Sequence, residues 1–503
     1  MAFLLSSVST LYFYFQKYII AYGDAESHLN IAKRVIHSPT PGFSQLGGIW
    51  LPLPHVLMLP FVYFDFLWRT GLAGAIVSGT SFIISCVFLY KLTYLITKNK
   101  YAGFLSFIVF GVNPNILYMQ STPMTELLLI TFFIVSTYYF IVFLKNGKNY
   151  IALIYAAFFG FCATLTRYDG WFLVLIQAFI LFIYYLIKTR ARSFWEGRLI
   201  LFSTLAFVGI GLWFLWDLSI LGDPLYFLNS PFSAKSQQHN WIAKGELPTY
   251  KNIFLSFLYY LTTSVDNIGI IVSVVSIIGL FYYFKNQKGA MRIFIPLLLL
   301  TPFAFYVLTL YLGQSVIFEP NLTPQHFEFH LFNTRYGIVM VPFAAFFFAY
   351  LFFRSRVFVK LFLMSLLVVQ TYQYITGGLT PISLQDGISG LSASANPDAQ
   401  IWIAKNYDGG YVLLDDYART ISVLRTKIPM QKVIYIGNKP YWDESLETPQ
   451  KYATWIVMQK DDAVWSNINN VPQVRAELYK YFQKAYTSPD ILIFKRNKEI
   501  KYP

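Results

Sequence analysis

The chain has 503 residues, of which 56% are hydrophobic and only 13% are charged, and its mean hydropathy is +0.49. Soluble domains carry roughly a quarter charged residues, so this composition excludes a single soluble globular enzyme. The 19% aromatic content lies mostly in long apolar runs and excludes an intrinsically disordered protein. The two cysteines, Cys86 and Cys162, both lie in apolar runs and cannot build a disulfide framework or a cysteine-rich metal site. The class that remains is a polytopic membrane protein.

Apolar runs that could cross a bilayer recur along the chain. About 20 apolar residues are needed to span ~30 Å of hydrocarbon. Eleven runs of roughly this kind occur, some short or interrupted, near residues 3–22, 71–97, 101–119, 125–144, 150–166, 170–187, 199–220, 266–284, 293–312, 336–353 and 361–377. We therefore predict an α-helical membrane protein with about eleven transmembrane helices. The first run has no charged n-region and no small-residue cleavage site, so we interpret it as a retained helix and not as a signal peptide.

The net charge of +14 is a topology signal. Five connections between predicted spans hold fourteen basic residues and one acid, Glu196; the connections begin near residues 98, 145, 188, 285 and 354. When the spans are counted alternately, all five connections fall on one side, and the positive-inside rule identifies that side as the cytoplasm. The N-terminus is then cytoplasmic and the C-terminus extracytoplasmic. The charge gives no reason to expect nucleic acid as a partner; membrane lipids are the expected surroundings.

The sequence divides at about residue 378. Residues 1–378 hold the predicted spans and a long first outer loop, 23–70, whose two interrupted apolar stretches indicate helices that lie in the membrane interface. Residues 379–503 have the charge density of a soluble protein. Strand-like segments alternate there with helical patterns, which indicates a small extracytoplasmic α/β domain. The helical patterns lie near 398–407 and 472–482, and the strand-like segments at 411–414, 432–436, 454–458 and 491–495.

Charged residues gather at the outer ends of the predicted spans. Apart from Glu196, the acids that precede residue 379 map to outer loops or outer helix ends, and so do Lys33, Arg34, Arg167 and Arg335. A charge beside the bilayer is costly unless it is paired or hydrated. The convergence of these residues predicts a site at one membrane face, where carboxylates and phosphate-binding cations meet.

The stretch Gly23–His28 directly follows the first span. Asp24 could be the N-cap of an interfacial helix that runs to about His37, with Glu26 in its first turn. Alternatively, Asp24 accepts a proton from a substrate hydroxyl or holds a metal, and His28 lines the same site. Capping and catalysis are compatible, because a cap fixes the position of the carboxylate. In an extended segment Asp24 and Glu26 could share one ion, whereas on a helix they diverge.

Two arginines are candidates for binding phosphate. Arg335 is the first choice, because a guanidinium binds phosphate oxygens bidentately and stays charged; its alternative role is to snorkel to the interface, beside Tyr336. Arg167 is the second choice, although it could simply pair with Asp169. Lys33 is the third.

Three further residues could line the site. Glu126 begins the fourth span and either caps that helix or faces the site. His326 and His330 are four residues apart and would share a face if helical, a spacing that can hold zinc or contact a donor phosphate. The metalloprotease pattern needs a glutamate directly after the first histidine, and Phe327 occupies that position, so a polar loop contact is the competing interpretation.

The arrangement of these motifs resembles the GT-C superfamily of membrane glycosyltransferases, and in particular its branch of protein O-mannosyltransferases and the lipid A aminoarabinose transferase. The matching features are the long first outer loop, the C-terminal outer domain, the acid pair Asp24 and Glu26, Glu126, and the Arg-Tyr pairs at 167–168 and 335–336. The resemblance implies that Asp24 takes the catalytic position. Ala25 separates two acids that are adjacent in many members, which leaves open the role of Glu26 and the participation of a divalent metal. No other cofactor is expected.

The resemblance predicts an inverting glycosyltransferase with a polyprenyl-phosphate sugar as donor and a hydroxyl of a protein, lipid or glycan as acceptor. Asp24 would act as base, and Arg335, Arg167 and Lys33 would bind the donor phosphate. The Trp-Trp-Asp motif of oligosaccharyltransferases is absent, which disfavours transfer to asparagine. The competing class is a transporter or lipid-binding membrane protein without chemistry. Secondary transporters typically contain Gly/Pro-broken helices in two matching halves, and the sequence shows no such pair.

Overall fold

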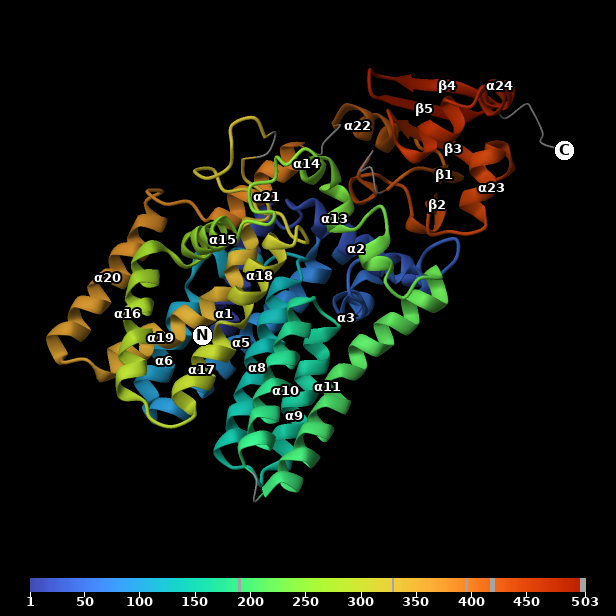
Figure 1. The fold of residues 1–503 in the computed structure, drawn as a ribbon. Helices are drawn as coiled ribbons and strands as arrows, with labels where there is room; N and C mark the ends of the chain where they lie inside the picture. The colour runs from blue at the N-terminus through green and yellow to red at the C-terminus, as the bar shows by residue number, and fades with distance from the viewer. Residues whose placement is uncertain (189–190, 328–329, 394–396, 417–420, 498–503) are drawn as a thin grey trace. The chain divides into compact units, whose positions relative to one another are not determined.

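The computed structural model describes residues 1–188, 191–327, 330–393, 397–416 and 421–497. The described chain is mostly helical, with a small sheet near the C-terminus (Figure 1). By compactness it divides into two units: the first contains residues 1–21, 48–54 and 75–389, and the second contains residues 22–47, 55–74 and 390–503. Most of the first outer loop therefore groups with the C-terminal domain, whereas the sequence division at residue 378 placed it with the spans.

The first unit is a polytopic bundle of apolar helices. Among the described residues, six helices are long and apolar enough to cross a membrane: α5 (Leu72–Thr97), α8 (Glu126–Lys145), α10 (Asp169–Ile187), α11 (Arg192–Leu221), the helix Thr334–Arg354, and α20 (Val357–Ile375). Two bent pairs raise the number to as many as eight: α15 (Ile253–Ile268) with α16 (Ile270–Asn286), and α17 (Met291–Leu299) with α18 (Thr301–Tyr311). Shorter apolar helices of this unit are α1 (Ala2–Phe15), α6 (Lys100–Gly111) and α9 (Tyr150–Thr164); most of a fourth, α3 (Leu53–Val62), belongs to the second unit.

Each of the eleven predicted runs overlaps one of these helices or pairs, and the expected multi-pass helical membrane fold is confirmed; six to eight of the described elements are long enough to cross a membrane, fewer than the eleven spans predicted. The helix Thr334–Arg354 consists of a 3₁₀ segment, η3 (Thr334–Met340), followed by α19 (Val341–Arg354). Helices α8, α9, α10 and α11 pack side by side (Figure 1).

The break between α15 and α16 bends the chain by 111°. Gly269 stands at the break with φ +91°, and a Cβ there would lie 2.2 Å from the Gln370 side-chain nitrogen. The Gln370 amide donates to the carbonyl of Ile268 (3.1 Å) and accepts from the N–H of Val272 (3.0 Å). Backbone groups freed inside a membrane bundle must find such partners. One side chain from α20 therefore satisfies both ends of the broken helix.

The second unit contains a five-stranded mixed sheet in the order β2-β1-β3-β5-β4. Its strands are β1 (Tyr411–Leu413), β2 (Val433–Ile434), β3 (Ala453–Gln459), β4 (Phe482–Thr487) and β5 (Ile491–Arg496), and its helices include α22 (Pro397–Asn406), α23 (Tyr441–Glu447) and α24 (Pro472–Tyr481). β1 pairs in parallel with β2 and β3, and β5 pairs antiparallel with β3 and β4. The predicted α/β domain is confirmed.

Strand β4 was not predicted from the sequence. The helix expected over 472–482 ends at Tyr481, and Phe482 already begins the strand. Phe482 is buried, but Gln483 and Lys484 after it are both exposed, so the alternation that marks a strand is weak. Such polar residues are typical of an edge strand.

Helices of the first outer loop bind the C-terminal domain within the second unit. These helices are α2 (Gly23–Ile36), η1 (Phe43–Leu46) and α4 (Asp65–Thr70). The Arg69 guanidinium on α4 donates to four backbone carbonyls at 2.5–3.3 Å, those of Val423, Leu424, Thr426 and Ile428. The Gln45 amide donates to the carbonyl of Gly437 (3.1 Å) and accepts from the Tyr435 hydroxyl (2.7 Å). These hydrogen bonds explain why the loop and the domain form one compact unit.

We expect Gly279→Ala to lower the thermal stability of the detergent-purified protein. Gly279 lies where α16 packs on α19, and a Cβ there would be 2.2 Å from the carbonyl oxygen of Phe347. Overpacking of this kind typically costs about 1–3 kcal/mol. The matched control is Gly197→Ala on α11, where a Cβ meets no atom within 4 Å. Equal melting temperatures for the two variants would contradict the close approach of α16 and α19.

Candidate functional site

A buried carboxylate joins two arginines in the first unit. Glu126 begins α8 and is fully buried, and its Oε1 lies 3.2 Å from Arg167 Nη1 and 3.2 Å from Arg335 Nε. Arg167 occupies the turn between α9 and α10, and Arg335 belongs to η3. A buried charge is tolerated only when it is paired and hydrogen-bonded. Glu126 thus holds both guanidiniums, and three of the predicted site residues are brought together.

Aromatic and hydroxyl groups complete this cluster. The Arg167 guanidinium donates to the hydroxyls of Thr125 and Tyr306, both at 3.0 Å, and lies 3.5 Å from Asp169. The Tyr336 ring lies 5.0 Å from the guanidinium of Arg167 and 4.9 Å from that of Arg335, and it stacks on Tyr306. Both guanidiniums therefore have fixed orientations, which suits the bidentate binding of an oxyanion.

A second group of acids includes Asp386, which contacts the backbone of Arg335, and Glu319. The Asp386 carboxylate accepts weakly from the backbone N–H of Arg335 at 3.4 Å. Glu319 is buried and accepts a hydrogen bond from Thr263 at 2.6 Å. Burial raises the pKa of Glu319 to about 8 against the effect of the Thr263 hydrogen bond, and the nearby Asp266 and Asp386 carboxyls raise it as well. Glu319 consequently keeps its proton near neutral pH.

The predicted catalytic acids lie in the second unit, in the first turn of α2. The helix begins at Gly23 and its N-cap is Tyr22, so the prediction that Asp24 is the N-cap is wrong by two residues. On the helix Asp24 and Glu26 diverge, which removes the shared-ion interpretation. Glu26 accepts a hydrogen bond from the Ser422 hydroxyl at 2.8 Å. His28, one turn further on, is buried with its Nδ1 2.9 Å from His55 Nε2.

Lys33 holds the loop helices together. Its ammonium lies 2.6 Å from Asp65, donates to the carbonyl of Val62 at 2.8 Å and faces the Trp68 ring at 5.0 Å. Burial alone would raise the pKa of Asp65, but the Lys33 ammonium outweighs burial and the pKa is lowered. The charge of Lys33 is therefore already paired, and its predicted role in phosphate binding gains no support from its contacts. Arg34 pairs with Asp416 and stacks on Tyr435 at 3.7 Å.

The two histidines of the third outer loop are exposed. His326 lies in a turn and contacts the Phe327 ring, and His330 lies in a bend. Neither residue is helical, so the shared helix face that a metal pair would need is not formed there. Over the described part of the chain, no group of three or more His, Cys, Asp or Glu side chains has the geometry to hold a metal ion.

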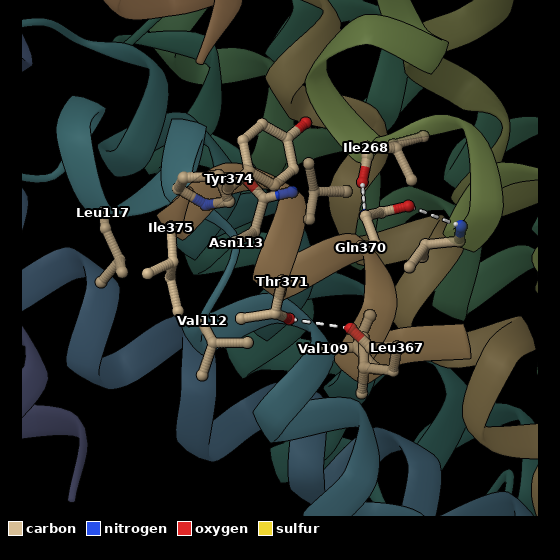
Figure 2. A pocket seen from close by; sticks show the side chains of 13 residues that line it. Val109, Val112, Asn113, Leu117, Ile268, Leu367, Gln370, Thr371, Tyr374 and Ile375 are labelled. Atoms are coloured by element: carbon tan, nitrogen blue, oxygen red, sulfur yellow. Dashed lines mark hydrogen bonds between the residues drawn. The ribbon is translucent and has the colours of Figure 1, made fainter. Parts of the chain in front are cut away.

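The first unit contains an apolar pocket of about 330 Å³ (Figure 2). Its lining comes from α6, α7 (Pro114–Met119), the α15–α16 break, α19 and α20, and includes Val109, Val112, Asn113, Leu117, Ile268, Leu367, Gln370 and Tyr374. The Asn113 amide donates to the carbonyl of Asn267 (2.9 Å), and the Asn267 amide donates to the carbonyl of Thr334 (2.7 Å), directly before Arg335. Two hydrogen bonds thus connect the pocket wall to the arginine segment.

No family model and no curated protein matches the sequence. Solved structures nevertheless resemble nearly the whole chain. ArnT from Cupriavidus metallidurans bound to undecaprenyl phosphate has a TM-score of 0.61 at 12% identity and covers 99% of both chains, and its apo state has a TM-score of 0.56 at 11% identity over 99% of this chain and 98% of ArnT. The apo Archaeoglobus fulgidus oligosaccharyltransferase has a TM-score of 0.50 at 12% identity, over 99% of this chain and 74% of that one.

These likenesses define the class of fold: the chain has the GT-C fold of polytopic membrane glycosyltransferases. The predicted resemblance to the aminoarabinose transferase branch is confirmed at the level of fold. That prediction rested on the motifs at 24–26, 126, 167–168 and 335–336.

Removing the Glu126 charge should destabilise the bundle. Glu126→Gln keeps the shape of the side chain but leaves two buried guanidiniums without their shared carboxylate, and breaking a buried pair costs about 3–5 kcal/mol. We expect the melting temperature of the purified protein to fall by several degrees. Glu196→Gln, at an exposed position near the start of α11, is the control and should change little. A stable Glu126→Gln protein would show that the two arginines do not depend on this carboxylate.

The proton on Glu319 predicts a pH dependence of stability. A carboxyl whose folded pKa is about 8, above its unfolded value near 4.5, stabilises the fold fully below pH 4.5 and loses this contribution as the pH rises through 8. We expect the melting temperature to decline between about pH 5 and pH 8, and the decline to be shallower in Glu319→Gln. Parallel pH profiles for the two proteins would mean that Glu319 does not hold the proton.

Proposed function

We propose that the protein is an integral membrane glycosyltransferase that moves a sugar from a polyprenyl-phosphate donor to a hydroxyl acceptor, with inversion at the anomeric carbon. The observation that carries the proposal is the pair of guanidiniums, Arg167 and Arg335, held by one buried carboxylate. The fold supports it, because ArnT shares this fold and its structure was determined with undecaprenyl phosphate bound. The same likeness disfavours a transporter without chemistry.

Arg335 and Arg167 bind the donor phosphate in this proposal. When the bond between the anomeric carbon and the phosphate oxygen breaks, negative charge develops on the leaving polyprenyl phosphate. Cations that already have the correct orientation stabilise such charge strongly where water is excluded. Glu126 and the Tyr336 ring supply that orientation, since both contact both guanidiniums. Glu126 is thus a positioning residue.

The apolar pocket takes part of the donor's hydrocarbon chain. Valine, leucine and isoleucine side chains dominate its lining, and the polar groups of Asn113 and Gln370 in its wall are occupied by backbone partners. Such a lining suits an isoprenoid chain better than a charged ligand. The link through Asn267 to Thr334 supports a common donor for the pocket and Arg335.

Asp24 acts as the general base. It removes the proton of the acceptor hydroxyl, the oxygen attacks the anomeric carbon from the face opposite the phosphate, and polyprenyl phosphate leaves. The contacts of the first turn of α2 support this role, because Ser422 binds Glu26 two residues away and thereby fixes the turn. We assign Glu26 to positioning that turn.

We further propose that the reaction occurs on the extracytoplasmic face, with the N-terminus in the cytoplasm and the domain 379–503 outside. The concentration of basic residues in alternate connections supports this orientation. A protein, a lipid or a glycan hydroxyl is the acceptor, and the transferred group is a hexose or pentose.

The direct test is Asp24→Asn in the purified full-length protein, supplied with polyprenyl-phosphate sugars and membrane extract. Loss of a general base should lower kcat by about 10²–10⁴-fold and leave the KM for the donor nearly unchanged. Asp490→Asn, an exposed acid of the same unit, is the control and should transfer sugar normally. Undiminished turnover by Asp24→Asn would remove this residue from the chemistry.

A further inference from the structure

An aromatic cluster surrounds the C-terminal end of α11 in the first unit. Trp213, Phe227 and Leu51 form its buried centre, and Tyr168, Trp171, Phe214 and Trp216 pack against them. The Trp213 and Trp216 rings are stacked, with centroids 5.1 Å apart and planes within 3° of parallel. Tyr168 stacks on Phe227 and directly follows Arg167 in the chain. The cluster therefore begins one residue from a guanidinium assigned to the donor phosphate.

Two polar groups in this cluster lack hydrogen-bond partners among the described residues. Asp217 is completely buried, and neither of its carboxylate oxygens accepts a hydrogen bond; the indole nitrogen of Trp216 is buried and donates none. The Trp213 indole, by contrast, lies within reach of the Tyr168 hydroxyl. Buried polar groups are nearly always hydrogen-bonded, and a buried carboxylate is the costliest exception. A buried tryptophan N–H also normally finds an acceptor. Two such groups on adjacent residues of one helix favour a ligand that supplies the missing partners.

The chemistry of the two groups restricts the ligand. The Trp216 N–H needs an acceptor, whereas the Asp217 carboxylate needs donors. A cation could satisfy Asp217 but cannot accept from the indole, and an anion could accept from the indole but cannot satisfy Asp217. A hydroxyl both donates and accepts, so a polyhydroxylated ligand satisfies both groups. Aromatic rings also pack well against the C–H face of a sugar ring. The combination fits a carbohydrate.

We infer that Trp213, Trp216 and Asp217 form a binding subsite for the sugar ring of the donor. The rings of Trp171, Phe214 and Trp216 are only half-buried, so this side of the cluster offers a face on which a sugar can stack. Burial and then the Asp217 carboxylate raise the pKa of the Tyr168 hydroxyl, against the effect of a hydrogen bond from Trp213, which reflects the closeness of Asp217 to the segment after Arg167. The assignment to the donor rests on the proposed function; carbohydrate binding itself does not.

The test is saturation-transfer NMR on the full-length protein in detergent, with D-mannose, D-glucose, D-galactose and D-xylose as free probes. At least one sugar should receive saturation from the wild-type protein. Asp217→Asn and Trp216→Phe should each weaken its binding about tenfold or more, as expected for losing a hydrogen bond to a charged or buried partner. Trp195→Phe, near the other end of α11 and stacked on Tyr184, is the matched control and should bind as wild type.

The variants separate this inference from the proposed transfer reaction. Asp217→Asn is nearly isosteric and removes an unpaired charge, so it should fold, and its melting temperature checks that it does. Asp24→Asn should retain sugar binding while transfer is lost. The inference is overturned if no probe is bound, or if binding is unchanged in Asp217→Asn and Trp216→Phe, in which case ordered water satisfies the two groups. Binding without any detectable transfer would count against the proposed function and leave the subsite standing.

Discussion

The ion pairs of Glu126 with Arg167 and Arg335 are the constraint on which the packing of the first unit, called the membrane unit below, depends. A carboxylate with no exposed surface cannot remain ionised without close counter-charges. The start of α8, the turn before α10 and the η3 segment must therefore converge, although Glu126 is 41 residues from Arg167 and 209 from Arg335 along the chain. The same contacts that satisfy Glu126 prevent the guanidiniums from turning away. Packing of the bundle and the fixed orientation of the two guanidiniums thus have one physical origin.

The two compact units hold different sets of the candidate residues. The membrane unit holds the guanidiniums, the apolar pocket and the aromatic cluster, whereas the second unit holds the acids of α2. That helix is bound to the C-terminal domain near both ends: Ser422 contacts Glu26, and Asp416 with Tyr435 binds Arg34. The C-terminal domain therefore supports the helix that carries Asp24, a role that the sequence alone did not suggest.

Patterns that repeat locally could be predicted from the sequence, and contacts between distant segments mostly could not. Apolar length identified the spans, and charges at helix ends identified Glu126, Arg167 and Arg335. The sequence did not reveal Ser422 or the pairing of Lys33 with Asp65, because both depend on tertiary contacts of ordinary polar residues. The contact between Asp386 and the backbone of Arg335 cannot be predicted from the sequence, because Asp386 lies beyond the last apolar run. Among the motifs noted, Gly23–His28 gave the correct helix but not its cap, since helix starts vary by one or two residues.

Gln370 connects α20 to the break between α15 and α16. The side-chain amide of Gln370, on α20, makes the hydrogen bonds that the helix backbone loses at the break. A side chain at position 269 would collide with this amide, so glycine is needed there. Asn267 on α15 in turn donates to the carbonyl of Thr334, directly before Arg335, so an unbroken path of hydrogen bonds and backbone runs from α20 through the break to the arginine segment.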